Sequence, residues 1–190
     1  MDGKPFALLD ACLLYSATMR DLLMRLTIRL AFQPKWTERI HVEWVENLLH
    51  NRLDLTRVQV ERTRDLMNRN GRDYHVPECE ALIPALNLPD ENDRHILAAA
   101  IACECPTIVT FNLSDFPART LREYNIRAIH PDVFLCELFD KDPLLFVAAV
   151  RDQIAGLTHP PQTIEDLLIK FRNENLAQLT RRLEEYREEF

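Results

Sequence analysis

Short apolar runs alternate with longer amphipathic segments over the first 130 residues. Phe6 to Asp10, Thr107 to Phe111 and Ile126 to Ile129 are short and apolar, which is typical of buried strands in a parallel sheet. After the first run, Met and Leu recur at intervals of three and four from Met19 to Leu30, which predicts an amphipathic helix. Strands separated by helices indicate an open, mostly parallel α/β sheet.

Further helices are predicted at about Trp36 to His50 and at about Leu55 to Asn70, where Asn70-Gly71 ends the second. Residues 80–89 are predicted as loop and short strand. Ile96 to Cys103 is apolar on every side, so we expect a helix that is covered all round.

Beyond about Asp140 the pattern changes to helices alone. His159-Pro160-Pro161 interrupts them, and Thr163-x-x-Asp166 is a plausible helix start. We therefore predict two parts, an α/β domain over residues 1–140 and a C-terminal helical extension over residues 141–190. The apolar residues of the extension are expected to pack mostly onto the main domain, and a contact with another protein or a second copy of the chain is the alternative.

Composition limits the class of protein. The 190 residues are 47% hydrophobic and 28% charged, enough for one buried core, and the apolar runs fall far short of the ~20 residues of a membrane span. FALLDACLLYSA is read as part of the fold, because Asp10 interrupts it as a signal peptide. The five cysteines lack the spacing of a zinc site, which favours buried thiols in a reducing cytoplasm.

The net charge of −7 argues against a generally basic nucleic-acid binder, although the first 75 residues carry a small positive excess. The arginines between residues 50 and 75 could guide a phosphate backbone, or form an ordinary solvated helix face. Only three glycines occur, which excludes a glycine-rich phosphate loop.

Two acids follow predicted strands. Asp10 ends the first run and Asp115 lies just past the second, and the carboxyl ends of parallel strands meet at one edge of a sheet. A carboxylate at the first position is costly to desolvate unless a cation meets it. A helix N-cap for Asp10, and a turn or cap for Asp115, are open alternatives.

A third acid opens the buried helix. The segment LPDENDRHILAAA places Asp90, Asn92 and Asp93 before its apolar part, where one or two such residues would cap the helix. We expect Asp90 and Asn92 to shape the turn, which leaves Asp93 free. Glu43 falls on the polar face of its helix, so the helical wheel predicts a solvated side chain.

Carboxylates that converge raise one another's pKa unless divalent cations neutralise them. Hard oxygen ligands of this kind favour Mg²⁺ or Mn²⁺, and such a site clamps phosphate oxygens and activates a water. A metal-dependent phosphodiesterase is the chemical interpretation.

At these residues the chain resembles the PIN domains, particularly the VapC-type ribonuclease toxins of bacterial toxin–antitoxin systems. The resemblance rests on LLDACLLYSATMRDLLMRL (8–26), RIHVEWVENLL (39–49), LPDENDRHILAAAIA (88–102), IVTFNLSDFP (108–117) and HPDVFL (130–135). It implies a three-layer α/β/α sandwich over residues 1–140 that hydrolyses RNA, followed by the helical extension that one branch of the family carries.

The resemblance also implies roles for individual residues. The catalytic and metal-binding acids would be Asp10, Glu43, Asp93 and Asp115, with Mg²⁺ or Mn²⁺ as cofactor. Supporting positions would be Thr110, Asn112 and Asp90, and Arg94 or His95 could contact a substrate phosphate. Asn92 departs from the family pattern, in which another Asp is usual at this position. The site would therefore have one carboxylate fewer with which to hold a second metal ion.

The partners implied are an RNA substrate, a cognate antitoxin and a second copy in a homodimer, in the cytoplasm and away from membranes. Two alternatives remain open. A HAD or receiver-like phosphoryl-transfer protein would also place Asp after the first strand, but Cys12 stands where HAD enzymes have a second Asp, and no lysine is suitably placed for a receiver. A PIN-like scaffold that binds without cutting is the other.

Overall fold

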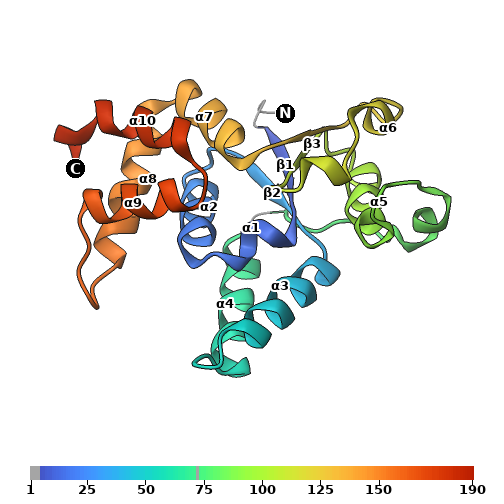
Figure 1. The fold of residues 1–190 in the computed structure, drawn as a ribbon, viewed down its shortest axis with the longest axis horizontal. Coiled ribbons are helices and arrows are strands. Elements are labelled where there is room, and N and C mark those ends of the chain that lie inside the picture. Colours follow the sequence, from blue (N-terminus) through green and yellow to red (C-terminus); the bar gives the residue numbers. More distant parts are fainter. Residues whose placement is uncertain (1–4, 72) are drawn as a thin grey trace.

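The computed structural model describes residues 5–71 and 73–190 of the protein. A parallel sheet in the order β2-β1-β3-β4 lies at its centre (Figure 1). The strands are β1 (Phe6–Leu9), β2 (Gln33–Lys35), β3 (Thr107–Val109) and β4 (Arg127–Ile129). The predicted α/β class with a parallel sheet is confirmed.

The register of the sheet places the carboxyl ends of neighbouring strands side by side. Leu8 of β1 lies opposite Lys35 of β2 on one side and Ile108 of β3 on the other. Because all strands run in the same direction, the residues after β1 and β3 emerge at one edge, as predicted. The edge strand β2 was missed, since it holds Pro34, which cannot donate to a ladder and argues against a strand in sequence.

Helices cover both sides of the sheet. Those of the first 130 residues are α1 (Ala11–Tyr15), α2 (Ala17–Ile28), α3 (Glu38–Asn51), α4 (Arg57–Asn70), α5 (Arg94–Ala102) and α6 (Ala118–Arg122). In Figure 1, α3 and α4 lie below the sheet and α5 and α6 to its right. Residues 96–100 of α5 are completely buried, which confirms the prediction of a helix covered all round for this part, whereas residues 101–103 are half-buried.

Three short 3₁₀ helices connect these elements. They are η1 (Glu80–Ala85), η2 (Glu91–Asp93) and η3 (Leu113–Asp115). The short strand predicted within residues 80–89 is therefore wrong, and Pro84 stands inside the 3₁₀ turn that replaces it. The helix predicted from Met19 to Leu30 is α2. It begins earlier, at Ala17, because the Ser16 hydroxyl accepts a hydrogen bond from the backbone N–H of Met19 and caps it.

The C-terminal helices are α7 (Pro131–Lys141), α8 (Pro143–Gly156), α9 (Ile164–Asn173) and α10 (Ala177–Glu185), followed by the 3₁₀ turn η4 (Arg187–Glu189). They gather to the left of the sheet, where α8 packs on α2 and α10 packs on α7 (Figure 1). Thr163 and Asp166 form a capping box at the start of α9, as predicted. Six apolar side chains of α9, α10 and the turn between them are buried, namely Leu167, Leu168, Phe171, Leu176, Leu179 and Leu183, whereas Ile169 of α9 is exposed.

A buried acid fixes the last helix. The carboxylate of Asp132 in α7 accepts hydrogen bonds from the backbone N–H groups of Gln178 and Leu179, both at 2.9 Å. The residue at the N-cap position of α10 is Leu176, which has no side-chain oxygen to offer. Asp132 therefore caps α10 from another helix, and joins the extension to α7.

All five cysteines are free thiols. Across residues 5–71 and 73–190, no helix combines the length and the hydropathy that crossing a membrane requires.

Candidate active site

Asp10 stands at the carboxyl end of β1, between two strands. Its backbone N–H donates to the carbonyl of Val109 in β3 at 3.1 Å, and only 6% of the residue is exposed. Its Oδ2 accepts hydrogen bonds from the hydroxyl of Thr110 at 2.6 Å and from the thiol of Cys12 at 3.1 Å. Although Asp10 occupies the N-cap position of α1, its side chain makes no capping hydrogen bond, so the N-cap alternative is wrong.

Two neutral donors thus orient the Asp10 carboxylate. The Thr110 hydroxyl accepts the backbone N–H of Asn112 at 3.0 Å, and its own proton is left for Asp10. Burial and the charge of Asp10 raise the pKa of the Cys12 thiol to about 12, which keeps the thiol protonated and able to donate at neutral pH. Thr110, predicted to support the site, does so by this contact with Asp10. Cys12 is a second hydrogen-bond partner of Asp10, which the sequence reasoning missed.

Asp93 stands where η2 passes into α5. It occupies the N-cap position of that helix without a capping hydrogen bond, while Asp90 caps the preceding turn by accepting the backbone N–H of Asn92 at 2.8 Å. Burial, and next the negative charges of Asp10, Asp90 and Asp115, raise the pKa of Asp93 to about 6. The expected division, with Asp90 in the turn and Asp93 free, agrees with this arrangement.

Glu43 of α3 meets α5 through a buried histidine. Its Oε1 lies 2.8 Å from Nε2 of His95 and 3.5 Å from Nε of Arg39. A third of the Glu43 side chain is exposed, whereas the helical wheel predicted a freely solvated one. His95 is 3% exposed and bound to Glu43, which does not support its predicted contact with a substrate phosphate.

The remaining predicted residues lie further out. Asp115 ends η3, is partly exposed and accepts a weak hydrogen bond from the Ser114 hydroxyl at 3.3 Å. Its charge reaches Asp93, as the raised pKa of that group shows. Arg94 is paired with Glu91 at 2.9 Å.

One open pocket of about 430 Å³ joins three of the four acids. Its lining consists of Asp10, Glu43, Asp93 and Asn112, together with Ala11, Cys12, Tyr15, Trp44, Asn47 and Asn51. Asp115 is not among the lining residues. The sequence reasoning assigned no role to Asn47 or Asn51, although their spacing of four and eight residues from Glu43 places all three on one helix face.

The three acids that line this pocket do not form a ready-made metal site. Within residues 5–71 and 73–190, no three His, Cys, Asp or Glu side chains are placed so that they hold a metal ion together. The donor set is nonetheless chemically suited to a hard divalent cation, because it consists of carboxylates whose mutual repulsion already raises the pKa of Asp93.

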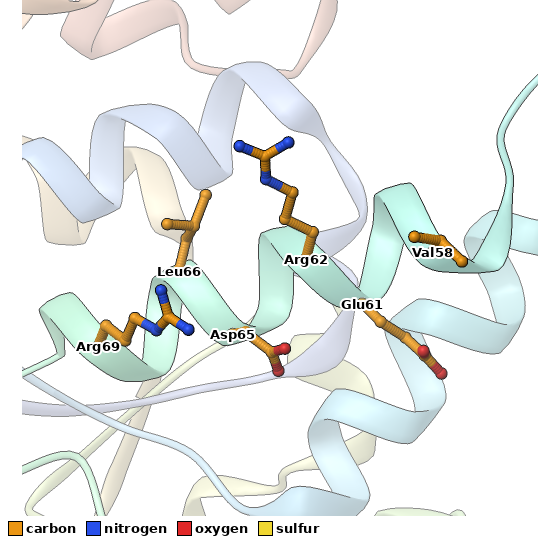
Figure 2. Close-up of a pocket in the computed structure, with 6 residues that line it drawn as sticks. All are labelled: Val58, Glu61, Arg62, Asp65, Leu66 and Arg69. Carbon is orange, nitrogen blue, oxygen red and sulfur yellow. The ribbon is translucent and has the colours of Figure 1, made fainter.

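The arginines of residues 50–75 are mostly engaged elsewhere. Their ion pairs join Arg52 to Asp54 and Arg57 to Glu46 at 2.7 Å, and Arg64 to Asp65 at 2.9 Å, while Arg72 lies outside the described residues. Arg62 and Arg69 form no ion pair within the described part of the chain. They line a separate pocket on α4, whose labelled side chains in Figure 2 include none of the four acids.

Comparisons with known proteins identify the family of the chain. A family model described as PIN domain matches residues 7–114, and a second, described as VapC50 C-terminal domain, matches residues 131–185. A protein of Mycobacterium tuberculosis (strain ATCC 25618 / H37Rv) described as "Putative ribonuclease VapC50" is 39% identical over 87 residues. That match covers 46% of this chain and 51% of the relative, so it spans about half of each. No solved structure gave a significant match.

The matched regions include Asp10, Glu43 and Asp93, and the resemblance read from the sequence motifs is confirmed. A HAD or receiver-like identity is excluded by the same match. The PIN domain model matches more than half of the chain. The chain therefore belongs to the PIN domain family.

Proposed function

We propose that this protein is a metal-dependent endoribonuclease whose catalytic, metal-binding acids are Asp10, Glu43, Asp93 and Asp115. One observation carries the proposal. Asp10 and Asp93 both occupy helix N-cap positions, neither caps its helix, and both line the same pocket. Neither acid stabilises its helix by capping, and their negative charges repel each other. Such an arrangement is typical of carboxylates that serve a catalytic site.

The cofactor proposed is Mg²⁺, or Mn²⁺ as an equivalent hard cation. Asp10, Glu43, Asp93 and Asp115 would hold it, and bound there it would supply positive charge for the scissile phosphate and lower the pKa of a water.

The protein's own groups prepare the acids for this task. Thr110 and Cys12 both donate to Oδ2 of Asp10, and no hydrogen bond from the described residues reaches its Oδ1, which is left to bind. His95 holds Glu43 from inside α5. With a pKa of about 6, Asp93 is mostly ionised at neutral pH and presents a carboxylate to the pocket.

We further propose that the protein is the toxin of a type II toxin–antitoxin pair. The support is the likeness of residues 131–185 to the VapC50 C-terminal domain and the relative described as a ribonuclease. A cognate antitoxin and a homodimer follow from this proposal as partners. Five free thiols suit the cytoplasm as its location.

A PIN-like scaffold that binds a partner without cutting is the second candidate function. The observation that favours it is the open placement of the acids, no three of which come together as ligands among the described residues.

Cleavage of RNA by the purified protein separates the two candidates. We expect single-stranded RNA to be cut with Mg²⁺ or Mn²⁺, to survive in EDTA, and to be cut again when the metal is restored in excess. DNA of the same sequence serves as the second substrate. Absence of cleavage with either metal across several RNAs, or cleavage that EDTA leaves unchanged, would contradict the proposal.

A further inference from the structure

The pocket that contains the acids has an uncharged half. The uncharged polar residues that line it include Tyr15 at the end of α1 and Asn47 and Asn51 on α3. No Asp, Glu, Lys or Arg other than the three acids lines the pocket within the described residues. A ligand that reaches the acids therefore extends onto neutral polar and aromatic surface.

Only one of the two aromatic rings in the pocket is open to a ligand. Trp44 is fully buried, its indole N–H donates to His41, and the guanidinium of Arg20 lies over its ring at 4.9 Å. Tyr15 is 38% exposed and sits at the rim. The Tyr15 ring can therefore accept a flat partner, whereas the Trp44 ring is covered by its neighbours.

Two amide side chains line the same pocket as this ring. The Nδ2 of Asn51 donates to the backbone carbonyl of Asn47 at 2.9 Å, which fixes the Asn51 amide and leaves its Oδ1 as an acceptor. The Asn47 amide forms no hydrogen bond within the described part of the chain, and both residues are exposed. Donors and acceptors are thus available in the same pocket as a stacking surface.

A ring for stacking and amide groups for hydrogen bonding are what a nucleobase requires, whereas a phosphate would require cations or unpaired N–H groups. Two cations near this half are already engaged. Arg20 donates to the backbone carbonyls of Leu14 and Tyr15, and Asp54 binds Arg52 in a bidentate pair. The uncharged half is therefore matched to a base and not to the backbone of a nucleic acid.

We infer that Tyr15, Asn47 and Asn51 form a nucleobase subsite for the nucleotide next to the scissile phosphate. The base stacks on Tyr15, and the Asn47 amide bonds to its edge and gives preference among bases. This inference rests on the proposed ribonuclease function, because only a cleaved RNA has a scissile phosphate. It assigns to these three residues the preference for one RNA sequence over another.

RNA binding in an Asp10→Asn background tests the subsite without cleavage. Anisotropy of labelled single-stranded RNA, with Mg²⁺ present, gives Kd for this parent and for Tyr15→Ala, Tyr15→Phe and Tyr124→Ala. Tyr124 is 37% exposed and precedes the amino end of β4, so it is a matched control at the opposite end of the sheet. We expect Tyr15→Ala to raise Kd roughly 5- to 100-fold and the other two variants to bind like the parent.

Base preference supplies the second readout. Oligonucleotides of A, C and U are compared, and Asn47→Ala is expected to reduce the differences in Kd among them. In the wild-type background Tyr15→Ala should raise KM with kcat within about twofold. Melting curves of each variant show that it is folded.

The outcomes separate this inference from the proposed function. Equal Kd for the parent and Tyr15→Ala, or no RNA binding by the parent, overturns the subsite. If binding depends on Tyr15 while the wild-type protein cuts no RNA, the subsite stands and the ribonuclease proposal fails.

Discussion

The hydroxyl of Thr110 donates a 2.6 Å hydrogen bond to the carboxylate of Asp10, across 100 residues of sequence. Thr110 is completely buried, and the backbone N–H of Asn112 occupies its acceptor side, which directs its proton to the acid. The pairing of β1 with β3 brings the two together. The sheet register thus determines how the first acid of the site is oriented.

Removing that hydroxyl should affect activity more than stability. Thr110→Val keeps the shape but leaves Asp10 with the Cys12 thiol alone, so we expect RNA cleavage to fall about 10-fold or more. The loss of stability should be about 1 kcal/mol. Initial cleavage rates and urea unfolding measure the two effects.

Thr110→Ser and Thr27→Val are the controls for this change. The first keeps the donor and should retain most activity, whereas Thr27 is a buried threonine whose hydroxyl binds the Leu23 carbonyl within α2. Full activity in Thr110→Val would show that the contact does not orient a functional acid.

Two glutamates on α3 provide a matched pair. Glu43 lines the pocket and binds His95, while Glu46 lies on the exposed side in an ion pair with Arg57. We expect Glu43→Gln to lower the cleavage rate about 10-fold or more and Glu46→Gln to leave it within about twofold. Similar rates for the two variants would remove Glu43 from the proposed set.

The raised pKa of Asp93 predicts a pH dependence of stability in EDTA. Its pKa rises from 3.8 to about 6 on folding, so the folded protein holds the proton more tightly than the unfolded chain. The destabilisation is full above about pH 6 and is lost as the pH falls towards 3.8. Asp93→Asn should therefore melt higher than the wild-type protein at neutral pH, and the difference should shrink from pH 6 to pH 4. A difference in Tm that is constant with pH would contradict this account.

The sequence allowed the fold class and three of the four strands to be predicted because these depend on local patterns. The apolar runs before Asp10 and Asn112 and the all-apolar helix after Asp93 carry their own signal. The strand β2 did not, since Pro34 has no donor and only the adjacent β1 makes the segment a strand. Helix spacing likewise placed Glu43 in solvent, because a helical wheel contains no information about a histidine on another helix.

In the candidate site, too, the residues that depend on local sequence could be predicted and the contacts that depend on the fold could not. Asp90 and Asp93 could be assigned from cap positions within one segment, whereas the contacts of Cys12 and Thr110 with Asp10 exist only after β1 and β3 pair. The boundary between residues 1–140 and 141–190 stays a prediction.

Asp132 should be important for the stability of the extension. Asp132 is buried and accepts two hydrogen bonds at the start of α10, so Asp132→Ala is expected to cost about 1–3 kcal/mol of unfolding free energy. Hydrogen exchange should accelerate first at the amides of Gln178 and Leu179. The control is Asp140→Ala, which removes an exposed partner of Arg182 and should cost under about 1 kcal/mol. Equal losses in the two variants would show that the capping contact is unimportant.

The most direct test of the metal-dependent ribonuclease is the cleavage rate of three single-carboxylate variants beside the wild-type protein. With Mg²⁺, Asp10→Asn and Asp93→Asn should each lose about 100-fold or more, because each removes a charge from the proposed ligand set. Asp21→Asn, which alters an acid paired with Arg25 outside this pocket, should cut at the wild-type rate. Cleavage by Asp10→Asn and Asp93→Asn at the wild-type rate would contradict the assignment of the site.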